Sequence, residues 1–315
     1  MKTVAAFFRL IRWPNLLFIV ITQLLFFYCV YAPLLKEFPT QNNQILFYLL
    51  ITASVLIAAG GYSINDYFDI QIDIINKPDK IVINKFIKRR WAIIWHFIFS
   101  TIGVILSLFV SLKTGIWLIG GINFLCVLLL WFYSTTFKRK LLSGNIFIAA
   151  LTAWVILAVY FFAGADVFSF KGWADNSVDF NVRRLFKFTL LYASFAFIMT
   201  LIREVIKDLE DVEGDRKYHC TTMPITWGVP ASKVFAAVWI VVCIAALGIV
   251  QLYAWQSGWG FAALYILILI ILPLVYMLLK LYKAATPAHY KSLSTVVKIV
   301  MLFGILSMLF LKFTS

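Results

Sequence analysis

The stretch ILFYLLITASVLIAAGGYSI, residues 45–64, is followed directly by NDYFDIQID, residues 65–73. The first stretch carries no charge, and about 20 apolar residues are enough to cross the roughly 30 Å hydrocarbon core of a bilayer. The second stretch then places three aspartates together in a chain that is 63% hydrophobic and 13% charged. Soluble domains contain about 45–50% apolar and 25% charged residues. The sequence therefore predicts an integral membrane protein with acids at the end of a membrane span.

Apolar runs of similar length recur along the chain. They lie at about residues 16–35, 45–64, 91–112, 116–136, 145–164, 185–202, 234–254, 261–280 and 295–311. Each run is long enough to form one transmembrane helix. Because no Gly- or Ser-rich linker divides the chain, we expect one all-α bundle of nine transmembrane helices, with residues 1–315 as a single domain.

Lysine and arginine gather on alternate connections between these runs. Cytoplasmic loops of membrane proteins carry an excess of these residues, so we expect the N-terminus in the cytoplasm and the C-terminus outside. This orientation puts 21 of the 28 cations inside, a pattern that fits a prokaryotic plasma membrane. They are Lys2, Arg9, Arg12, Lys77, Lys80, Lys85, Lys88, Arg89, Arg90, Lys138, Arg139, Lys140, Arg203, Lys207, Arg216, Lys217, Lys233, Lys280, Lys283, Lys291 and Lys298. The net charge of +14 is then explained by topology and by attraction to anionic membrane lipids, and no nucleic-acid binding is inferred.

The acids follow a different pattern, because ten of the 14 lie in two short segments after the second and sixth apolar runs. The first row is Asp66, Asp69 and Asp73, and the second row is Asp208, Asp211 and Asp215. Both rows have the spacing i, i+3, i+7, and they lie 142 residues apart. These positions share one face of a helix. Each segment is therefore expected to present three carboxylates on one helical face at the cytoplasmic boundary of the membrane.

Carboxylates at this spacing repel one another unless a cation neutralises them. Their oxygens are hard ligands, which suit Mg²⁺ together with water and a phosphate-bearing ligand. Two rows facing each other would suit a lipid diphosphate, whose leaving-group charge a metal neutralises. An allylic cation left after the C–O bond breaks needs a water-poor, aromatic-lined cavity, and 17% of the residues are aromatic. The four cysteines and three histidines are dispersed, so a zinc site is not expected.

The residues of both segments also resemble a known family. NDYFDIQID resembles the N-D-x-x-D-x-x-x-D motif of the UbiA-type intramembrane prenyltransferase superfamily, and REVIKDLEDVEGDRKYHCTTMPITWG, residues 203–228, resembles its second Asp-rich motif. The resemblance covers essentially the whole chain. It implies a nine-helix fold, transfer of a prenyl group from a prenyl diphosphate donor, and one Mg²⁺ held by each row.

The resemblance also implies roles for single residues. Asn65 would orient a diphosphate oxygen or a water, and Tyr133 would lie near the reacting carbon. Lys138 and Lys140 would reach the diphosphate as point charges, although the charge bias of inner loops explains both lysines equally well. RWPN, residues 12–15, resembles the family's R-x-x-N signature, which puts Arg12 and Asn15 at the mouth of the first helix as binding residues. Arg12 would pair with an acceptor phosphate or carboxylate, unless it is only a topology charge. Arg203 would clamp an anion or offset the neighbouring acids.

The sequence indicates the acceptor substrate less specifically than it indicates the type of reaction. INKPD, residues 75–79, and KDLEDVEGD, residues 207–215, are most similar to the digeranylgeranylglyceryl phosphate synthase branch. That branch implies transfer of a geranylgeranyl group to the hydroxyl of geranylgeranylglyceryl phosphate, a lipid acceptor. Where such enzymes often read R-P-I-P-S-G and T-L-P-I, this chain has KIVIN, residues 80–84, and TMPI, residues 222–225.

Two alternatives remain open. One is an aromatic acceptor of quinone or haem biosynthesis, since the ionisation step would be the same. The other is a cation transporter, because acids inside membranes mark ion pathways. Against transport, six of the nine runs carry no acid in their middles. No protein partner is inferred from the sequence.

Overall fold

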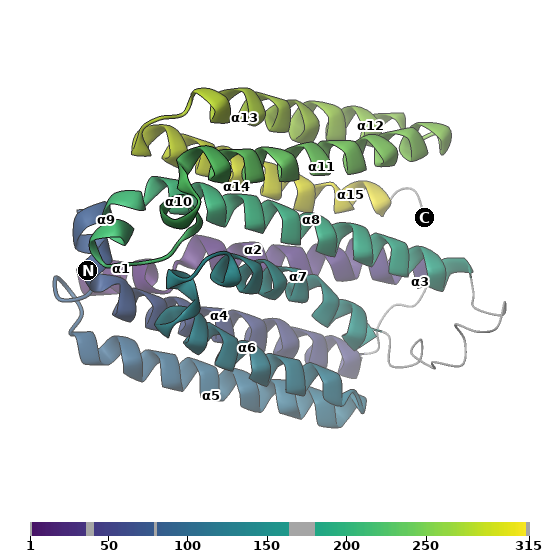
Figure 1. Cartoon of the computed structure of the whole chain (residues 1–315). Coiled ribbons are helices and arrows are strands. Elements are labelled where there is room, and N and C mark those ends of the chain that lie inside the picture. Colours follow the sequence, from purple (N-terminus) through teal and green to yellow (C-terminus); the bar gives the residue numbers. More distant parts are fainter. Residues whose placement is uncertain (1, 36–40, 79–80, 164–179, 313–315) are drawn as a thin grey trace. The chain divides into compact units, whose positions relative to one another are not determined.

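Long apolar runs fold into helices wherever the structure describes the chain, because a helix satisfies its backbone hydrogen bonds without water. The computed structural model describes residues 2–35, 41–78, 81–163 and 180–312 (Figure 1). Asp79 and Lys80, which belong to the motifs and charge pattern above, lie outside these ranges. Within them the chain forms no strand, and Ile83 and Ile87 form one isolated bridge. The predicted all-α fold is confirmed.

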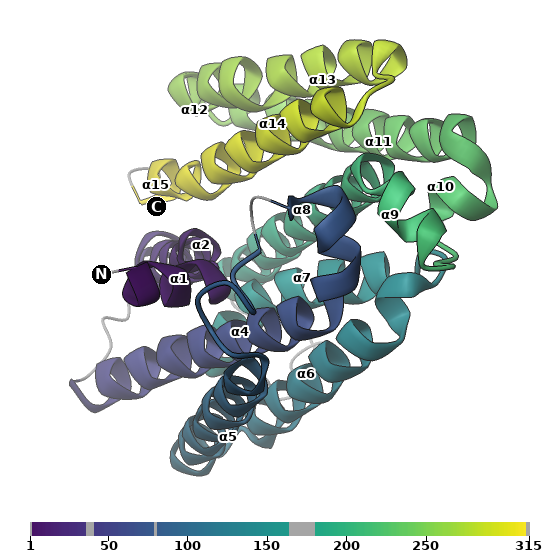
Figure 2. The same cartoon turned by 90° about the vertical axis from the view of Figure 1, so that its left-hand side faces the viewer.

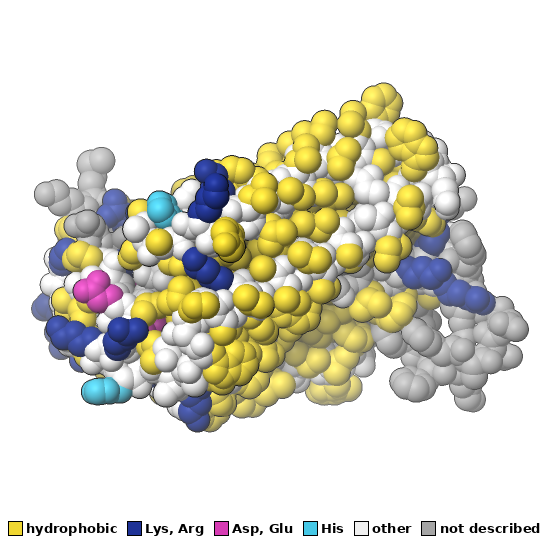
Figure 3. Space-filling model, turned by 45° about the horizontal axis from the view of Figure 1, so that its top comes forward, with side chains coloured by type: hydrophobic (Ala, Val, Ile, Leu, Met, Phe, Trp, Pro, Cys, Tyr) yellow, Lys and Arg dark blue, Asp and Glu magenta, His cyan; other side chains and the backbone are white. Residues whose placement is uncertain are grey.

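The described residues contain nine helical segments that are long and apolar enough to cross a membrane, as the sequence predicts. They are Trp13–Leu35, Asn43–Asn76, Arg89–Thr114, Trp117–Thr135, Ser143–Ala163, Asn181–Glu210, Gly228–Gln256, Gly260–Lys283 and Pro287–Leu311. On the face shown in Figure 3, hydrophobic side chains form a wide band, and charged side chains lie toward its ends. The protein is thus an integral membrane protein.

Packing divides the chain into two units. Unit 1 comprises Met1–Lys138 and Trp154–Thr189, and unit 2 comprises Arg139–Ala153 and Leu190–Ser315. Two helices, α7 (Ser143–Ala163) and α8 (Phe180–Glu210), contribute residues to both units. The single domain predicted for residues 1–315 stays a prediction.

Unit 1 is built around one long helix, α4 (Gln41–Asn76), which packs against α2 (Trp13–Leu25), α5 (Arg89–Thr114) and α6 (Trp117–Thr135). Figures 1 and 2 both show α5 alongside α4. The other elements of unit 1 are α1 (Lys2–Leu10), α2 (Trp13–Leu25), η1 (Phe26–Tyr31), α3 (Ala32–Leu35), α5 (Arg89–Thr114), α6 (Trp117–Thr135) and the start of η3 (Phe137–Arg139). At 36 residues, α4 is about 54 Å long, well over the roughly 30 Å of hydrocarbon. Its last turns can therefore extend beyond the apolar layer.

Two glycines allow α4 to approach its neighbours closely. A Cβ on Gly60 would lie 2.8 Å from Oγ of Ser100 and 3.2 Å from the carbonyl oxygen of His96, both on α5. A Cβ on Gly61 would lie 2.8 Å from a methyl carbon of Leu130 on α6. Small residues at such contacts let helix backbones pack tightly in membranes. Gly60 and Gly61 thus serve helix packing just before the first row.

We expect Gly60→Leu to destabilise unit 1, because the added side chain meets a backbone carbonyl that cannot move aside. The expected loss of unfolding free energy is roughly 1–3 kcal/mol, as for other overpacked sites. Thermal unfolding of the purified protein in detergent measures it. Gly121→Leu on α6 is the matched control, since nothing lies within 4 Å of a Cβ placed there. Equal unfolding temperatures for the two variants would contradict the packing role.

Unit 2 packs its helices around an apolar core. The core cluster contains four fully buried residues from different helices: Ile206 of α8, Ile240 of α11 (Gly228–Gln256), Leu274 of α13 (Leu272–Lys283) and Val297 of α14 (Pro287–Leu306). Besides parts of α7 and α8, its elements are α9 (Val212–Lys217), α10 (Met223–Thr226), α11 (Gly228–Gln256), α12 (Gly260–Ile266), η5 (Leu267–Ile271), α13 (Leu272–Lys283), α14 (Pro287–Leu306) and α15 (Met308–Leu311). This core fixes the end of α8, which carries the start of the second row.

Candidate functional site

The first row lies on the last turns of α4, in unit 1. Asp66, Asp69 and Asp73 all fall within this one helix, which confirms the predicted helical row. Asp69 is buried, with 4% of its surface exposed, while Asp66 and Asp73 are half-buried. A buried carboxylate needs a hydrogen-bonded or charged partner. The partners come from outside α4 as well as from within it.

Arg12 binds Asp66 from the junction between α1 and α2. Its Nη2 donates to Oδ1 of Asp66 at 2.6 Å, and its guanidinium lies 5.1 Å from the centre of the Tyr62 ring. The Arg12 backbone is left-handed, with φ 51° and ψ 52°, a conformation that costs of order 1–3 kcal/mol for a residue other than glycine. Burial lowers the pKa of Arg12, but the charges of Asp66 and Tyr62 and the hydrogen bond to Asp66 together raise it by more. The guanidinium therefore stays charged.

The helix that precedes Arg12 is held by the connection between α4 and α5. Ala6 and Leu10 of α1 share a buried apolar cluster with Val82, Ile83 and Ile87 of that connection. Ile70 and Ala92 complete the buried part of the cluster. This packing fixes the end of α1, and with it the position from which Arg12 reaches the first row.

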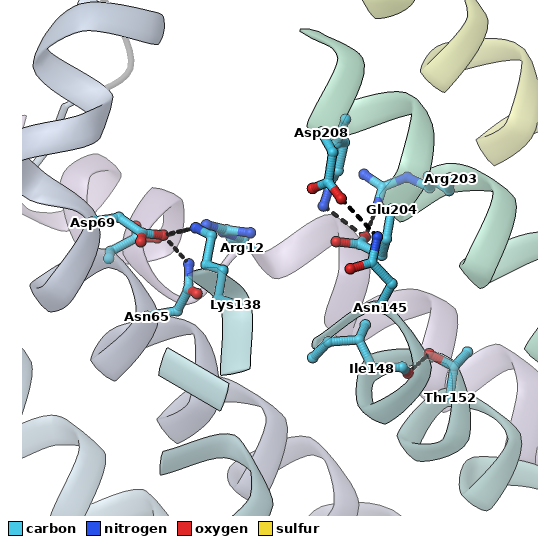
Figure 4. A network of polar contacts seen from close by, with 12 residues as sticks. Arg12, Asn65, Asp69, Lys138, Asn145, Ile148, Thr152, Arg203, Glu204 and Asp208 are labelled. Atoms are coloured by element: carbon cyan, nitrogen blue, oxygen red, sulfur yellow. Dashed lines mark hydrogen bonds and ion pairs between the residues drawn. The ribbon is translucent and has the colours of Figure 1, made fainter. Parts of the chain in front are cut away.

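Asp69 is held by two donors, Lys138 and Asn65 (Figure 4). Lys138 lies in η3, directly after α6, and its Nζ forms an ion pair with Oδ2 of Asp69. Nδ2 of Asn65, one turn earlier on α4, donates to the same oxygen at 2.6 Å. Burial lowers the pKa of Lys138, but the charges of Asp69, Tyr133 and Asp73 together with the Asp69 hydrogen bond raise it by more. Lys138 therefore stays charged, and Tyr133 lies near enough to interact with it.

One polar atom beside this cluster lacks a partner. Oδ1 of Asn65 is buried and accepts no hydrogen bond, although Nδ2 of the same amide is bonded to Asp69. A buried acceptor without a donor is unfavourable by about 1–3 kcal/mol. Carboxylate and amide oxygens are the hard ligands that Mg²⁺ takes in proteins. The donor set of the first row thus fits Mg²⁺, although no three His, Cys, Asp or Glu side chains of the described residues converge on one point as the structure stands.

The second row, in unit 2, does not lie on one continuous helix. Asp208 lies in the last turn of α8, which ends at Glu210, and Asp215 lies in α9. Asp211 separates the two helices, with φ −99° and ψ 8°, in the sparsely populated region between helix and strand. Aspartate favours such positions because its side chain competes for backbone hydrogen bonds. The prediction of a single helical face is therefore wrong for the second row.

Neutral side chains bind two members of the second row. Nδ2 of Asn145, in the first turn of α7, donates to Oδ2 of Asp208 at 2.8 Å (Figure 4). Oγ1 of Thr222 donates to Oδ2 of Asp215 at 3.4 Å. Asn145 and Thr222 are both buried. Sequence reasoning missed both residues, and the only signal for Asn145 was a polar side chain at the start of an apolar run.

Glu204 is a further residue that sequence reasoning did not single out. It is buried on α8 and accepts from Nη1 of Arg203 at 3.0 Å and from Nζ of Lys207 at 2.7 Å. Arg203 was expected to clamp an anion or to offset the acids, and here its charge is opposed by Glu204. The ion pair of Glu204 could have been predicted from the sequence, since Lys207 lies one helical turn after it. The result is a cation-rich cluster one turn before Asp208.

The other predicted residues lie near these clusters or on the surface. Asn15 lies in the first turn of α2 and donates its backbone N–H to the carbonyl of Arg12 at 2.8 Å. Tyr133 is half-buried on α6, and Lys140 is exposed after η3. The structure therefore brings Arg12, Asn65 and Lys138 directly onto the first row. The predicted ligand contacts of Asn15, Tyr133 and Lys140 stay predictions.

Solved structures share the fold. A structure from work on the "biosynthesis of Digeranylgeranylglyceryl phosphate synthase in membranes" is 25% identical, with a TM-score of 0.62 over 98% of this chain and 99% of that chain. A UbiA homologue from Archaeoglobus fulgidus bound to DMAPP and Mg²⁺ is 14% identical, with a TM-score of 0.56 over 96% of this chain and 98% of that chain. At that identity the second likeness concerns the fold alone.

Sequence comparison gives the family. The chain is 31% identical to the digeranylgeranylglyceryl phosphate synthase of Methanosphaera stadtmanae over 240 residues, 76% of each protein. Residues 43–302 match the UbiA prenyltransferase family, a range that includes both rows. The chain belongs to the UbiA prenyltransferase family and is a prenyltransferase.

Proposed function

We propose that the protein transfers a geranylgeranyl group from its diphosphate to the hydroxyl of geranylgeranylglyceryl phosphate. The observation that carries the proposal is the cluster at the end of α4, where the carboxylates of Asp66 and Asp69 meet the cations Arg12 and Lys138. A metal-bound diphosphate requires carboxylates that bind the metal and cations that bind its phosphate oxygens. The relative from Methanosphaera stadtmanae, which is named for this synthase, supports the choice of acceptor.

Each row would hold one Mg²⁺. The first ion would be bound by Asp66, Asp69 and Asp73, and the second by Asp208, Asp211 and Asp215. When bound, Mg²⁺ supplies Lewis-acid neutralisation of the charge that builds on the leaving diphosphate. The unpartnered Oδ1 of Asn65 supports the first assignment, since it places one more hard oxygen beside Asp69.

The chain's own cations would then bind and orient the substrates. Lys138 and Lys140 would bind diphosphate oxygens, and Arg203 would add a positive charge near the second row. Arg12 and Asn15 would bind the phosphate of the acceptor. The Arg12 guanidinium is suited to this role because its planar fork can donate two parallel hydrogen bonds to a phosphate.

In the reaction, the allylic C–O bond of the donor breaks and the diphosphate leaves with the electron pair. The acceptor hydroxyl oxygen then bonds to the allylic carbon and releases its proton, so that an ether and diphosphate are the products. Tyr133 would lie near the reacting carbon, where its ring face can stabilise positive charge. The apolar helices exclude water, which would otherwise capture the allylic cation.

The site is proposed to face the cytoplasm. Both rows follow apolar runs and lie on two of the inner segments, and all inner segments together carry 21 of the chain's 28 lysines and arginines, as the charge rule for cytoplasmic loops requires. By the same rule the N-terminus would lie inside and the C-terminus outside, and the strength of the charge bias fits a prokaryotic plasma membrane. Residues 1–315 would act as one catalytic domain.

A transfer assay tests the proposal. Purified protein, Mg²⁺ and radiolabelled geranylgeranyl diphosphate are offered geranylgeranylglyceryl phosphate, 4-hydroxybenzoate or dihydroxynaphthoate in separate tubes. We expect label in an ether lipid only in the first tube, and none when EDTA is present. Label on an aromatic acceptor instead would keep the prenyltransferase activity and overturn the proposed acceptor.

A further inference from the structure

Two carboxylates of the first row are contacted by cations. Asp66 is paired with Arg12, and Asp69 with Lys138. Neither cation belongs to α4, since Arg12 lies before α2 and Lys138 lies after α6. Arginine and lysine side chains are cationic at neutral pH, and each lies within ion-pair distance of its carboxylate. The carboxylates are thus charge-compensated before any ligand is present.

The second row offers a contrast at Asp208. Its hydrogen-bond donor is the neutral amide of Asn145, at 2.8 Å. On α8, Arg203 and Lys207 both donate to Glu204. The hydrogen bond to Asp208 comes from an amide, which a metal can share or replace without displacing a charged donor, although the charge of Lys207 also acts on Asp208. At Asp66 and Asp69, in contrast, a metal has to displace a charged donor.

A carboxylate oxygen that accepts a short hydrogen bond from a cationic side chain is less available as a metal ligand. Oδ1 of Asp66 accepts from Arg12 at 2.6 Å, and Oδ2 of Asp69 accepts from both Lys138 and Asn65. Mg²⁺ requires its oxygens at about 2.0–2.1 Å in near-octahedral geometry. The dication and the two side-chain cations would carry four positive charges against the three carboxylates of the row, so they would also repel one another. A ligand with negative charge must therefore bind before Mg²⁺, Arg12 and Lys138 can all remain beside the first row.

We propose that Arg12 and Lys138 occupy the first row as competitors of the divalent cation, that Lys138 moves to oxygens of the diphosphate when it arrives, and that Arg12 moves to the phosphate of the acceptor. The diphosphate supplies the negative charge that displaced Lys138 requires, and the acceptor phosphate supplies it for Arg12. Metal and diphosphate therefore bind the first row with positive coupling, each raising the affinity of the protein for the other. The inference rests on the proposed function, because it assumes a diphosphate ligand.

The test measures Mn²⁺ binding by electron paramagnetic resonance, with Mn²⁺ alone and with inorganic diphosphate. It uses Asp208→Asn as the background, so that the ion measured belongs to the first row. In this background Lys138→Met should bind Mn²⁺ alone roughly tenfold more tightly. The same variant should lose a similar factor in affinity for inorganic diphosphate in the presence of Mn²⁺. Arg12→Gln should also bind Mn²⁺ alone more tightly, but its affinity for inorganic diphosphate should stay within about twofold, because Arg12 is assigned to the acceptor phosphate.

Lys85→Met is the matched control. Its Nζ donates to the carbonyl of Pro78 on the connection after α4, so the variant removes the same charge near the first row without touching a carboxylate of it. Lys85→Met should leave both affinities within about twofold, a change small against the coupling expected. An equal rise in Mn²⁺ affinity for Lys85→Met and Lys138→Met would mean that the effect comes from long-range charge alone, and it would overturn the proposal.

A second variant at Lys138 separates the loss of its charge from a loss of the fold. Removing Lys138 leaves the carboxylate of Asp69 without its ion pair, and such a loss can destabilise a fold. Lys138→Gln keeps a hydrogen-bond donor for Asp69 and should still bind Mn²⁺ alone more tightly than the parent. Unchanged or weaker Mn²⁺ binding in Lys138→Gln would overturn the proposal. Because no acceptor or turnover is involved, a failed transfer assay would leave this result standing, and the two failures are distinguishable.

Discussion

Replacing Asp66 or Asp208 with asparagine is expected to lower the rate of prenyl transfer by roughly 10³-fold or more. Asparagine keeps the shape of the side chain and one acceptor oxygen but removes the charge that would hold Mg²⁺. A Lewis-acid metal contributes several kcal/mol to the stabilisation of charge in a transition state, and each 1.4 kcal/mol changes a rate about tenfold. The measurement is the initial rate of labelled ether-lipid formation by each purified variant.

The control for these variants is Glu213→Gln. Glu213 is an exposed residue of α9, between Asp211 and Asp215 in the chain, and it belongs to neither row. Its neutralisation should leave the rate within about twofold, as expected for a surface charge. Thermal unfolding in detergent must give similar midpoints for all three variants, so that a lost fold is not mistaken for a lost site. Near-normal rates in Asp66→Asn and Asp208→Asn would sink the metal assignment for both rows.

The membrane spans could be predicted almost completely from the sequence, because crossing a bilayer depends on length and hydropathy alone. The predicted run 45–64 nevertheless ends 12 residues before α4 does, at Asn76. Hydropathy falls at the first aspartate, but backbone hydrogen bonds continue through the charged turns. The extension carries the whole first row, so the functional end of α4 was found from the spacing of the acids rather than from hydropathy.

The acids of the site could also be predicted, whereas their pairing with Arg12 and Lys138 could not. Asp66, Asp69 and Asp73 stand out because acids are rare in this chain and their spacing repeats. Arg12 is 54 residues from its partner Asp66, and Lys138 is 69 residues from Asp69. Such pairs depend on how helices pack, and a single sequence does not encode that packing in a local pattern.

Backbone detail was the other part that the sequence did not reveal. The left-handed conformation of Arg12 is not expected for arginine, since its side chain disfavours positive φ. The break in the second row at Asp211 likewise depends on how α8 ends and α9 begins. Both features lie beside predicted functional residues, where local rules are most often broken by tertiary contacts.

Removing divalent cations is expected to abolish transfer. Neither row contains histidine or cysteine, and the donors around the first row are carboxylates and the amide oxygen of Asn65. This set suits Mg²⁺ and Mn²⁺, which prefer oxygen ligands, and suits Zn²⁺ poorly, because Zn²⁺ in proteins is held mainly by imidazole and thiolate groups. Dialysis against EDTA should therefore reduce the rate below detection, and added Mg²⁺ or Mn²⁺ should restore it where equimolar Zn²⁺ does not.

The thermal unfolding midpoint provides the control for metal removal. The buried clusters of unit 1 and unit 2 are apolar, and the packing at Gly60 and Ile240 involves no carboxylate. EDTA should consequently leave the midpoint almost unchanged while it removes activity, so that a loss of rate reports the site and not the fold. Transfer that persists in EDTA, or that Zn²⁺ restores as well as Mg²⁺ does, would mean that the two rows hold something other than a hard dication. In that case the ion pairs of Arg12 and Lys138 would be the permanent state of the first row, and the diphosphate would have to be bound elsewhere.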